Sequence, residues 1–192
     1  MPKARLGVLI SGRGSNMAAL LHASRLMDDC PYEIVLVAAN DAQAPGLALA
    51  RAEGIATFAQ SHKGLKRAEF DALITAELQH HNVTHVALAG YMRLLSPAFV
   101  AQWAGRCFNI HPSLLPAHKG LHVYEAVLVA GETVSGCTVH LVTAELDGGP
   151  ILGQAQVAVL PDDTPDALAA RILIAEHQLY PRVLAQYLQE NP

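Results

Sequence analysis

The amino-acid sequence predicts an α/β fold: a single Rossmann-like, doubly wound and mostly parallel sheet with helices on both faces. Short apolar segments alternate with amphipathic segments along the first half of the chain, the order expected of repeated βαβ units. Residues 34–39 are apolar throughout, as in a strand covered on both sides. The 192 residues, 52% hydrophobic and 16% charged, suffice for a buried core and exclude intrinsic disorder. We expect one domain over residues 1–192.

Strand and helix patterns alternate regularly as far as residue 89. The apolar run at residues 5–10 ends in a glycine-rich turn, which is typical of a buried strand. Met17, Leu20 and Leu21 then recur at helical spacing. The predicted order is strand 5–10, helix 16–27, strand 33–39, helix 46–53, strand 55–58, helix 66–80 and strand 83–89.

The second half of the chain has a different pattern. Its predicted order is strand 107–111, a proline-rich loop, helix 124–130, strand 134–142, strand 151–159 and a long final helix. Two strands in succession without a helix between them indicate antiparallel additions to the sheet. Thr164 and Pro165 supply an N-cap and a first residue for the final helix, which Pro181 is expected to kink or split.

Composition and charge exclude several classes of function. Thirteen Lys and Arg against seventeen Asp and Glu give a net charge of −4 without any run of like charges, which argues against a nucleic-acid or membrane surface. No stretch of about 18 apolar residues is present to span a bilayer. Three scattered cysteines indicate reduced thiols. We therefore expect a cytoplasmic protein.

The first predicted strand is joined to its helix by Ser11-Gly12-Arg13-Gly14-Ser15-Asn16. The glycines allow main-chain N–H groups to converge, and the helix N-terminus adds positive potential, which together suit a phosphate monoester. A dinucleotide is disfavoured because Met17 stands where the third glycine of G-x-G-x-x-G belongs. The alternative is an ordinary strand–helix turn with Ser15 as its N-cap.

The most specific string in the chain is Asn109-Ile110-His111-Pro112-Ser113-Leu114-Leu115-Pro116. Strand alternation puts Asn109 and His111 on the same side of the sheet, and Pro112 holds His111 in an extended conformation. A fixed carboxamide beside a fixed imidazole offers two donors to an oxyanion formed during acyl transfer. The alternative is that His111 only closes a loop hydrogen bond.

Asp147 lies in the string Glu145-Leu146-Asp147-Gly148-Gly149-Pro150. It is either a turn residue or a carboxylate beside His111 that favours the imidazolium form of that ring. Ligands of open α/β sheets bind at the carboxyl ends of the strands, so this loop joins the site only if the strand before it runs in the right direction. The other histidines form no metal motif, and His140 is expected in the core or behind the site.

These strings together resemble the folate-dependent formyltransferases, and among them the phosphoribosylglycinamide formyltransferase family. The matching strings follow the family's order from about residue 6 to about residue 184, at residues 11–16, 89–97, 109–116, 120–122 and 146–150. The resemblance implies transfer of a formyl group from 10-formyltetrahydrofolate, a co-substrate, to the amine of glycinamide ribonucleotide in purine biosynthesis. It implies no metal, no nucleic-acid or membrane partner, and either a monomer or a homodimer.

The resemblance also implies a role for individual residues. Asn109 and His111 are expected to stabilise a tetrahedral intermediate, with Asp147 supporting His111. The substrate contacts are expected from Gly14, Ser15 and Asn16 at the phosphate and Glu176 at the nucleotide sugar. The folate contacts are expected from Arg67, Met92, Arg93, Leu94, Leu95 and Asn109. The nucleotide half then covers about residues 1–100 and the folate and catalytic half about residues 88–192.

Two departures from the family and three rival functions remain open at this point. Pro192 ends the chain where many members continue into another strand, and Val123-Tyr124 replaces a more polar pair. A 10-formyltetrahydrofolate hydrolase shares the Asn, His and Asp but uses water as acceptor, and usually has an N-terminal regulatory domain. A methionyl-tRNA formyltransferase needs a C-terminal RNA-binding domain. A non-catalytic folate- or phosphate-binding module has no need of an intact Asn109, His111 and Asp147.

Overall fold

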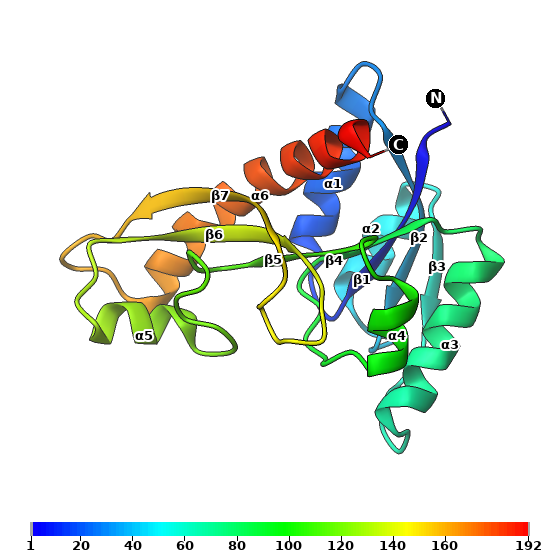
Figure 1. The fold of residues 1–192 in the computed structure, drawn as a ribbon, viewed down its shortest axis with the longest axis horizontal. Coiled ribbons are helices and arrows are strands. Elements are labelled where there is room, and N and C mark those ends of the chain that lie inside the picture. Colours follow the sequence, from blue (N-terminus) through cyan, green and yellow to red (C-terminus); the bar gives the residue numbers. More distant parts are fainter. Residues whose placement is uncertain (1, 192) are drawn as a thin grey trace.

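The computed structural model describes residues 2–191 and contains one seven-stranded sheet in the order β3-β2-β1-β4-β5-β6-β7 (Figure 1). The strands are β1 (Ala4–Ile10), β2 (Tyr32–Ala39), β3 (Ala56–Ala59), β4 (His85–Leu88), β5 (Cys107–His111), β6 (Val134–Leu141) and β7 (Ile151–Ala158). The helices are α1 (Ser15–Leu26), α2 (Pro45–Ala52), α3 (Arg67–His80), α4 (Pro97–Gln102), α5 (Val123–Val129) and α6 (Pro165–Glu190).

The topology is that of a doubly wound sheet with an antiparallel end. β1 pairs in parallel with both β2 and β4, β2 pairs in parallel with β3, and β4 with β5. β6 is antiparallel to β5, and β7 is antiparallel to β6. The predicted fold class and its late antiparallel additions are therefore confirmed. The chain reverses its winding direction between β1 and β4, which makes this the point where a crevice is expected.

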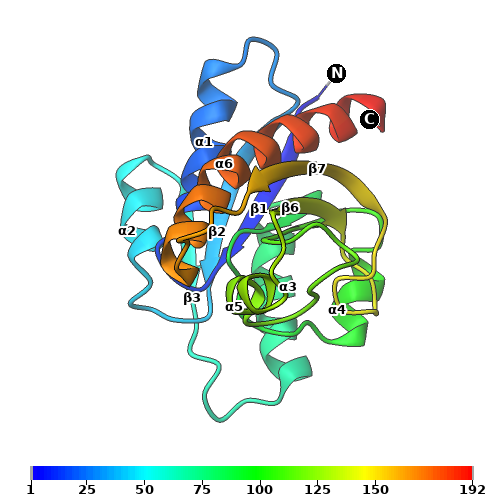
Figure 2. The same cartoon turned by 90° about the vertical axis from the view of Figure 1, so that its left-hand side faces the viewer.

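Helices cover both faces of the sheet, and each face has its own apolar core. Figure 2 shows α1 and α6 on one side and α3 and α4 on the other. Strand alternation divides the side chains between them, since Val8 packs with α1, α2, α5 and α6 while Leu9 packs with α3 and α4. Within residues 2–191, we find no helix with the length and apolarity needed to cross a lipid bilayer.

Two helices differ from the sequence-based expectation. α4 was not expected; the Ser96 hydroxyl caps it by accepting from Phe99 N–H, and Pro97 is its first residue. The expected split at Pro181 is wrong, because α6 continues through that residue to Glu190. Side chains on both sides of Pro181 are buried, and the Tyr180 hydroxyl donates to the carbonyl oxygen of Leu88 at 3.0 Å. This packing offsets the hydrogen bond that a proline cannot make.

Candidate active site

The expected crevice is at the carboxyl ends of the central strands, where segments from both halves of the chain meet. Residues 11–14 leave β1, residues 89–96 leave β4, and residues 112–122 leave β5. The first two segments flank the point where the sheet reverses its winding direction. Met92 N–H donates to the Ser11 hydroxyl oxygen at 2.8 Å, so these two segments are in direct contact.

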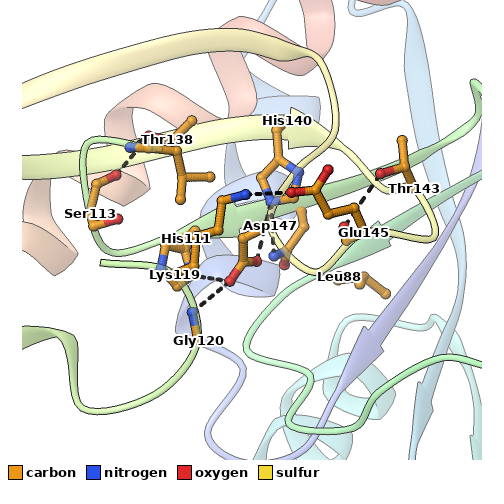
Figure 3. Close-up of polar contacts among 12 residues, drawn as sticks. Leu88, His111, Ser113, Lys119, Gly120, Thr138, His140, Thr143, Glu145 and Asp147 are labelled. Carbon is orange, nitrogen blue, oxygen red and sulfur yellow. Dashed lines mark hydrogen bonds and ion pairs between the residues drawn. The ribbon is translucent and has the colours of Figure 1, made fainter. Parts of the chain in front are cut away.

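His111 and Asp147 are brought together at the end of β5, which is one of the two alternatives that the sequence left open for Asp147 (Figure 3). His111 Nδ1 lies 3.5 Å from Asp147 Oδ2, and the two residues are only 6% and 9% exposed. Gly120 N–H donates to the same carboxylate oxygen at 2.9 Å. His111 Nε2 lies 2.8 Å from the carbonyl oxygen of His118. Both ring nitrogens therefore face oxygen acceptors and can act as donors when the ring is protonated.

His140 links Asn109 to Asp147 (Figure 3 shows His140 and Asp147). His140 Nδ1–H donates to its neighbour's carbonyl, Leu141 O, at 2.9 Å. Nε2 is then free to accept, and it lies 3.3 Å from Asn109 Nδ2 and 3.7 Å from Asp147 Oδ1. Burial lowers the pKa of His140, which favours this neutral form. We call Asn109, His111, His140 and Asp147 the His111 cluster.

Asp147 belongs to this cluster although the strand before its loop does not run in the direction that the sequence analysis required. The strand before its loop runs antiparallel, yet β6 ends with Leu141 beside Phe108, close to where β4 ends with Leu88 beside Asn109. The loop therefore begins at the level of the crevice. A Cβ on Gly149 would lie 1.8 Å from the carbonyl oxygen of Leu141, so only glycine permits this close return of the chain.

The loop after β1 is held by backbone packing and by one buried contact to α6. Gly14 has a φ of 72°, and a Cβ there would lie 3.1 Å from Gly46 Cα, at the start of α2. Asn16 Nδ2 donates to Glu176 Oε2 at 2.9 Å, which brings together two of the expected substrate residues. Burial raises the pKa of Glu176. Within residues 2–191, Asn16 Oδ1 is buried without a partner.

This pairing changes how the loop presents its donors. Asn16 is one of the residues expected at the phosphate, and here its side-chain amide points at Glu176. The N–H groups of the first turn of α1 have no intrahelical partner, and the Ser15 side chain is half-buried beside them. The alternative of Ser15 as N-cap is wrong, since Gly14 occupies that position and no side chain caps the helix.

The expected folate residues lie on the other side of the crevice. Arg67 is exposed at the first position of α3, and Phe70 lies one turn further along the same helix. The Arg93 guanidinium lies over the Phe70 ring, 4.8 Å from the ring centroid. Met92 and Leu94 are 70% and 52% exposed. Leu95 packs at the edge of the core beneath them. Exposed apolar side chains beside guanidinium groups suit a flat ring with a carboxylate tail.

Two supporting features had no clear pattern in the sequence. Thr138 lies across from His111 in the β5–β6 pair, and its hydroxyl donates to the carbonyl oxygen of Ser113 at 2.6 Å. It also accepts from Leu115 N–H at 3.0 Å, so one buried hydroxyl fixes the loop that follows His111. The second feature is a row of polar residues at the ends of the parallel strands, described below. The only signal for Thr138 in the sequence is that it lies two residues before His140 on the same strand, so both side chains point to the same face of the sheet.

The comparison with known protein families agrees with this fold. The formyl transferase family model matches residues 4–184, nearly the whole chain. The chain therefore belongs to the formyl transferase family, and the resemblance noted in the sequence is confirmed. Among its relatives, the phosphoribosylglycinamide formyltransferase of Escherichia coli is 42% identical over 181 residues, covering 94% of this chain and 85% of that protein.

Other relatives are longer, and solved structures share the whole fold. The trifunctional purine biosynthetic protein adenosine-3 of Drosophila pseudoobscura is 48% identical over 186 residues; the match covers 96% of this chain but only 14% of that protein. The crystal structure of phosphoribosylglycinamide formyltransferase from Brucella melitensis superposes with a TM-score of 0.91 at 48% identity, covering 97% of this chain and 96% of the other.

Proposed function

We propose that this chain transfers the formyl group of 10-formyltetrahydrofolate to the amine of glycinamide ribonucleotide, as a single domain over residues 1–192. The observation that carries the proposal is the meeting of Asn109, His111 and Asp147 at the carboxyl end of β5. Family membership and the names of its relatives support the choice of substrates. The buried loop of residues 14–16, with Glu176 beside it, supports a nucleotide as acceptor.

The residues of the His111 cluster provide the functions that formyl transfer requires. The attacking amine converts the formyl carbonyl into an oxyanion, which needs donors placed where the charge develops. The Asn109 carboxamide is one such donor. Protonated His111 is the other, when its Nε2–H leaves the His118 carbonyl oxygen for the substrate, and it then delivers that proton to the departing folate nitrogen. Asp147 stabilises the protonated ring, and accepts a proton from the attacking ammonium directly or through water. Excluding water from this buried cluster strengthens each of these interactions.

The remaining residues hold the two substrates next to each other. The N-terminus of α1, with Gly14, Ser15 and Asn16, binds the phosphate through main-chain N–H groups, and Glu176 binds the sugar hydroxyls. Arg67 and Arg93 bind the carboxylate tail of the folate, while the main chain and apolar side chains of residues 92–95 contact its ring system. Asn16 Oδ1, buried without a partner within residues 2–191, is an acceptor that a hydroxyl of the nucleotide can satisfy.

One absorbance assay separates this function from its hydrolytic rival. Purified protein is mixed with 10-formyltetrahydrofolate, and loss of the formyl group is followed with and without glycinamide ribonucleotide. Deformylation that requires the nucleotide, with formylglycinamide ribonucleotide as product, is expected. Equal rates with and without the nucleotide would instead identify a hydrolase. Absence of deformylation in both mixtures would indicate a non-catalytic binding module.

A further inference from the structure

A row of hydrogen bonds crosses the carboxyl ends of four neighbouring strands. It begins at Met92 after β4, continues through Ser11 after β1 and Asn40 after β2, and ends at His62 after β3. This sequence of residues follows the strand order β3-β2-β1-β4 without a gap. We call these four residues the strand-end relay. None of them belongs to the His111 cluster or to the loop of residues 14–16.

The two hydrogen bonds that Ser11 makes point in one direction. Met92 N–H donates to the Ser11 hydroxyl at 2.8 Å, and that hydroxyl donates to Asn40 Oδ1 at 2.7 Å. His62 Nδ1 lies 3.2 Å from the Asn40 main-chain carbonyl oxygen and 3.3 Å from Asn40 Nδ2. Because a carbonyl oxygen can only accept, the ring N–H donates to it and links His62 to Asn40 through the main chain. Because the Ser11 hydrogen is directed at Asn40, a lone pair of the same oxygen is left for Met92. Hydrogen bonds aligned in this way polarise and strengthen one another.

Asn40 and His62 are fixed firmly enough to hold this direction. Asn40 is 8% exposed, its carboxamide oxygen accepts from the Ser11 hydroxyl, and its main-chain carbonyl oxygen lies 3.2 Å from His62 Nδ1. The His62 ring packs edge-on against Phe70, with centroids 6.3 Å apart. Phe70 also contacts Arg93, whose guanidinium lies over the ring, 4.8 Å from the ring centroid. The relay and Phe70 therefore support both Met92 and Arg93, two of the residues expected to bind folate.

We propose that the strand-end relay couples the two substrate sites, with Ser11 and Asn40 as positioning residues for the folate segment. Ser11 is the first residue of the loop that, on the proposed function, binds the nucleotide phosphate at residues 14–16. A phosphate bound there orders the loop from its start, and the Ser11 hydroxyl then holds Met92 N–H in place. Bound nucleotide thereby tightens the folate site, and by linkage folate tightens the nucleotide site by the same factor.

The coupling is measured by titration calorimetry with tetrahydrofolate, which has no formyl group to transfer. Its Kd is determined with and without saturating glycinamide ribonucleotide, and the ratio of the two values is the coupling factor. For the wild-type protein we expect a factor of at least ~5, the lower end of typical couplings. In Asn40→Leu, which keeps the side-chain volume but removes both hydrogen-bonding groups, the factor should fall to within about twofold of unity.

A matched control removes a buried hydrogen bond elsewhere. The Tyr32 hydroxyl donates to the carbonyl oxygen of Leu20 at 2.9 Å, between β2 and α1. Tyr32→Phe deletes this bond without touching the relay, so it should keep the wild-type coupling factor. If Asn40→Leu does not fold, His62→Phe tests the same point, since it retains an aromatic ring beside Phe70 but removes the N–H that donates to the Asn40 carbonyl oxygen.

Three results would overturn the inference: a wild-type coupling factor near unity, an unchanged factor in the relay variant, or an equal loss of the factor in Tyr32→Phe. A parallel weakening of both affinities at constant ratio would mean that Asn40 has only a structural role. Failure of the proposed function is distinguishable from these outcomes, because it would appear as no nucleotide-dependent deformylation by the wild-type protein.

Discussion

The loop after β1 and the end of β5 lie at the same expected crevice, but they present different kinds of chemical group to a ligand. Residues 14–16 present main-chain N–H groups at a helix N-terminus, and their shape depends on a close approach between Gly14 and Gly46. The His111 cluster presents side chains from β5, β6 and the loop after β6, each held by another member. One region depends on backbone conformation and the other on side-chain chemistry.

This difference determines which substitutions are informative in each region. Side chains of the His111 cluster can be truncated without changing the backbone, so their loss should appear in the rate of reaction. Gly14 has a left-handed backbone conformation, and any other residue there would place its Cβ 3.1 Å from Gly46 Cα. A substitution of Gly14 would therefore disturb the loop as a whole. The phosphate site is better tested by adding charge at Ser15.

The largest effect is expected for His111→Ala. This change removes an oxyanion donor and the proton carried by the ring, so kcat should fall by ~10²–10³. The Kd for glycinamide ribonucleotide, measured by titration calorimetry, should stay within about twofold because the nucleotide loop is separate. A variant with near-normal kcat would show that side-chain chemistry at β5 is not what drives the reaction.

A smaller loss of rate is expected for Asp147→Asn. The Asp147 backbone has a φ of 48°, a conformation that asparagine also tolerates. The substitution therefore removes the negative charge 3.5 Å from His111 while preserving the shape of the loop. We expect kcat to fall roughly tenfold to a hundredfold. Asp163→Asn is the matched control, because Asp163 pairs with Arg171 rather than with the cluster; an equal loss in that variant would contradict the role of Asp147.

The nucleotide loop should respond to charge instead of to truncation. Ser15→Asp places a carboxylate at the N-terminus of α1, where it favours the helix but repels a dianionic phosphate. The Kd for glycinamide ribonucleotide should rise at least ~10-fold, about 1.4 kcal/mol, while the Kd for tetrahydrofolate alone changes little. Ser15→Ala, which adds no charge, should bind nearly as well as the wild type. Equal weakening by both variants would show that the hydroxyl, not the helix terminus, binds the phosphate.

The smallest effect is a pH dependence of stability that originates at His140. Because burial lowers its pKa in the folded protein, the unfolded chain binds the proton more readily near the ordinary value of about 6.5. Stability should therefore fall as the pH drops below that value, by at most about 1.4 kcal/mol per pH unit. Urea unfolding at pH 7.5 and 5.5 should show a smaller difference for His140→Gln than for wild type. An equal difference would locate the pH dependence elsewhere.

Much of the fold could be predicted because the first half of the chain has a clear periodicity of apolar residues. Apolar runs of strand length, amphipathic runs of helical spacing and glycine-rich turns at the right places fix a βαβ rhythm. The pairing of Asn109 and His111 on one side of a strand likewise follows from alternation. The expected split failed at Pro181, because a local rule about helix breaking cannot include the buried surface that keeps α6 continuous through that residue.

By itself the sequence determined the fold class, the family and the candidates for the reacting residues, since each of these depends on local pattern. Only the tertiary structure decided which groups meet. It brought Asn16 into contact with Glu176, 160 positions away in the sequence. It placed Asp147 beside His111, although the strand before the Asp147 loop runs antiparallel to β5. It also placed His140 between Asn109 and Asp147 and aligned the strand-end relay. Such contacts depend on the order and register of strands in the sheet, which no local periodicity specifies.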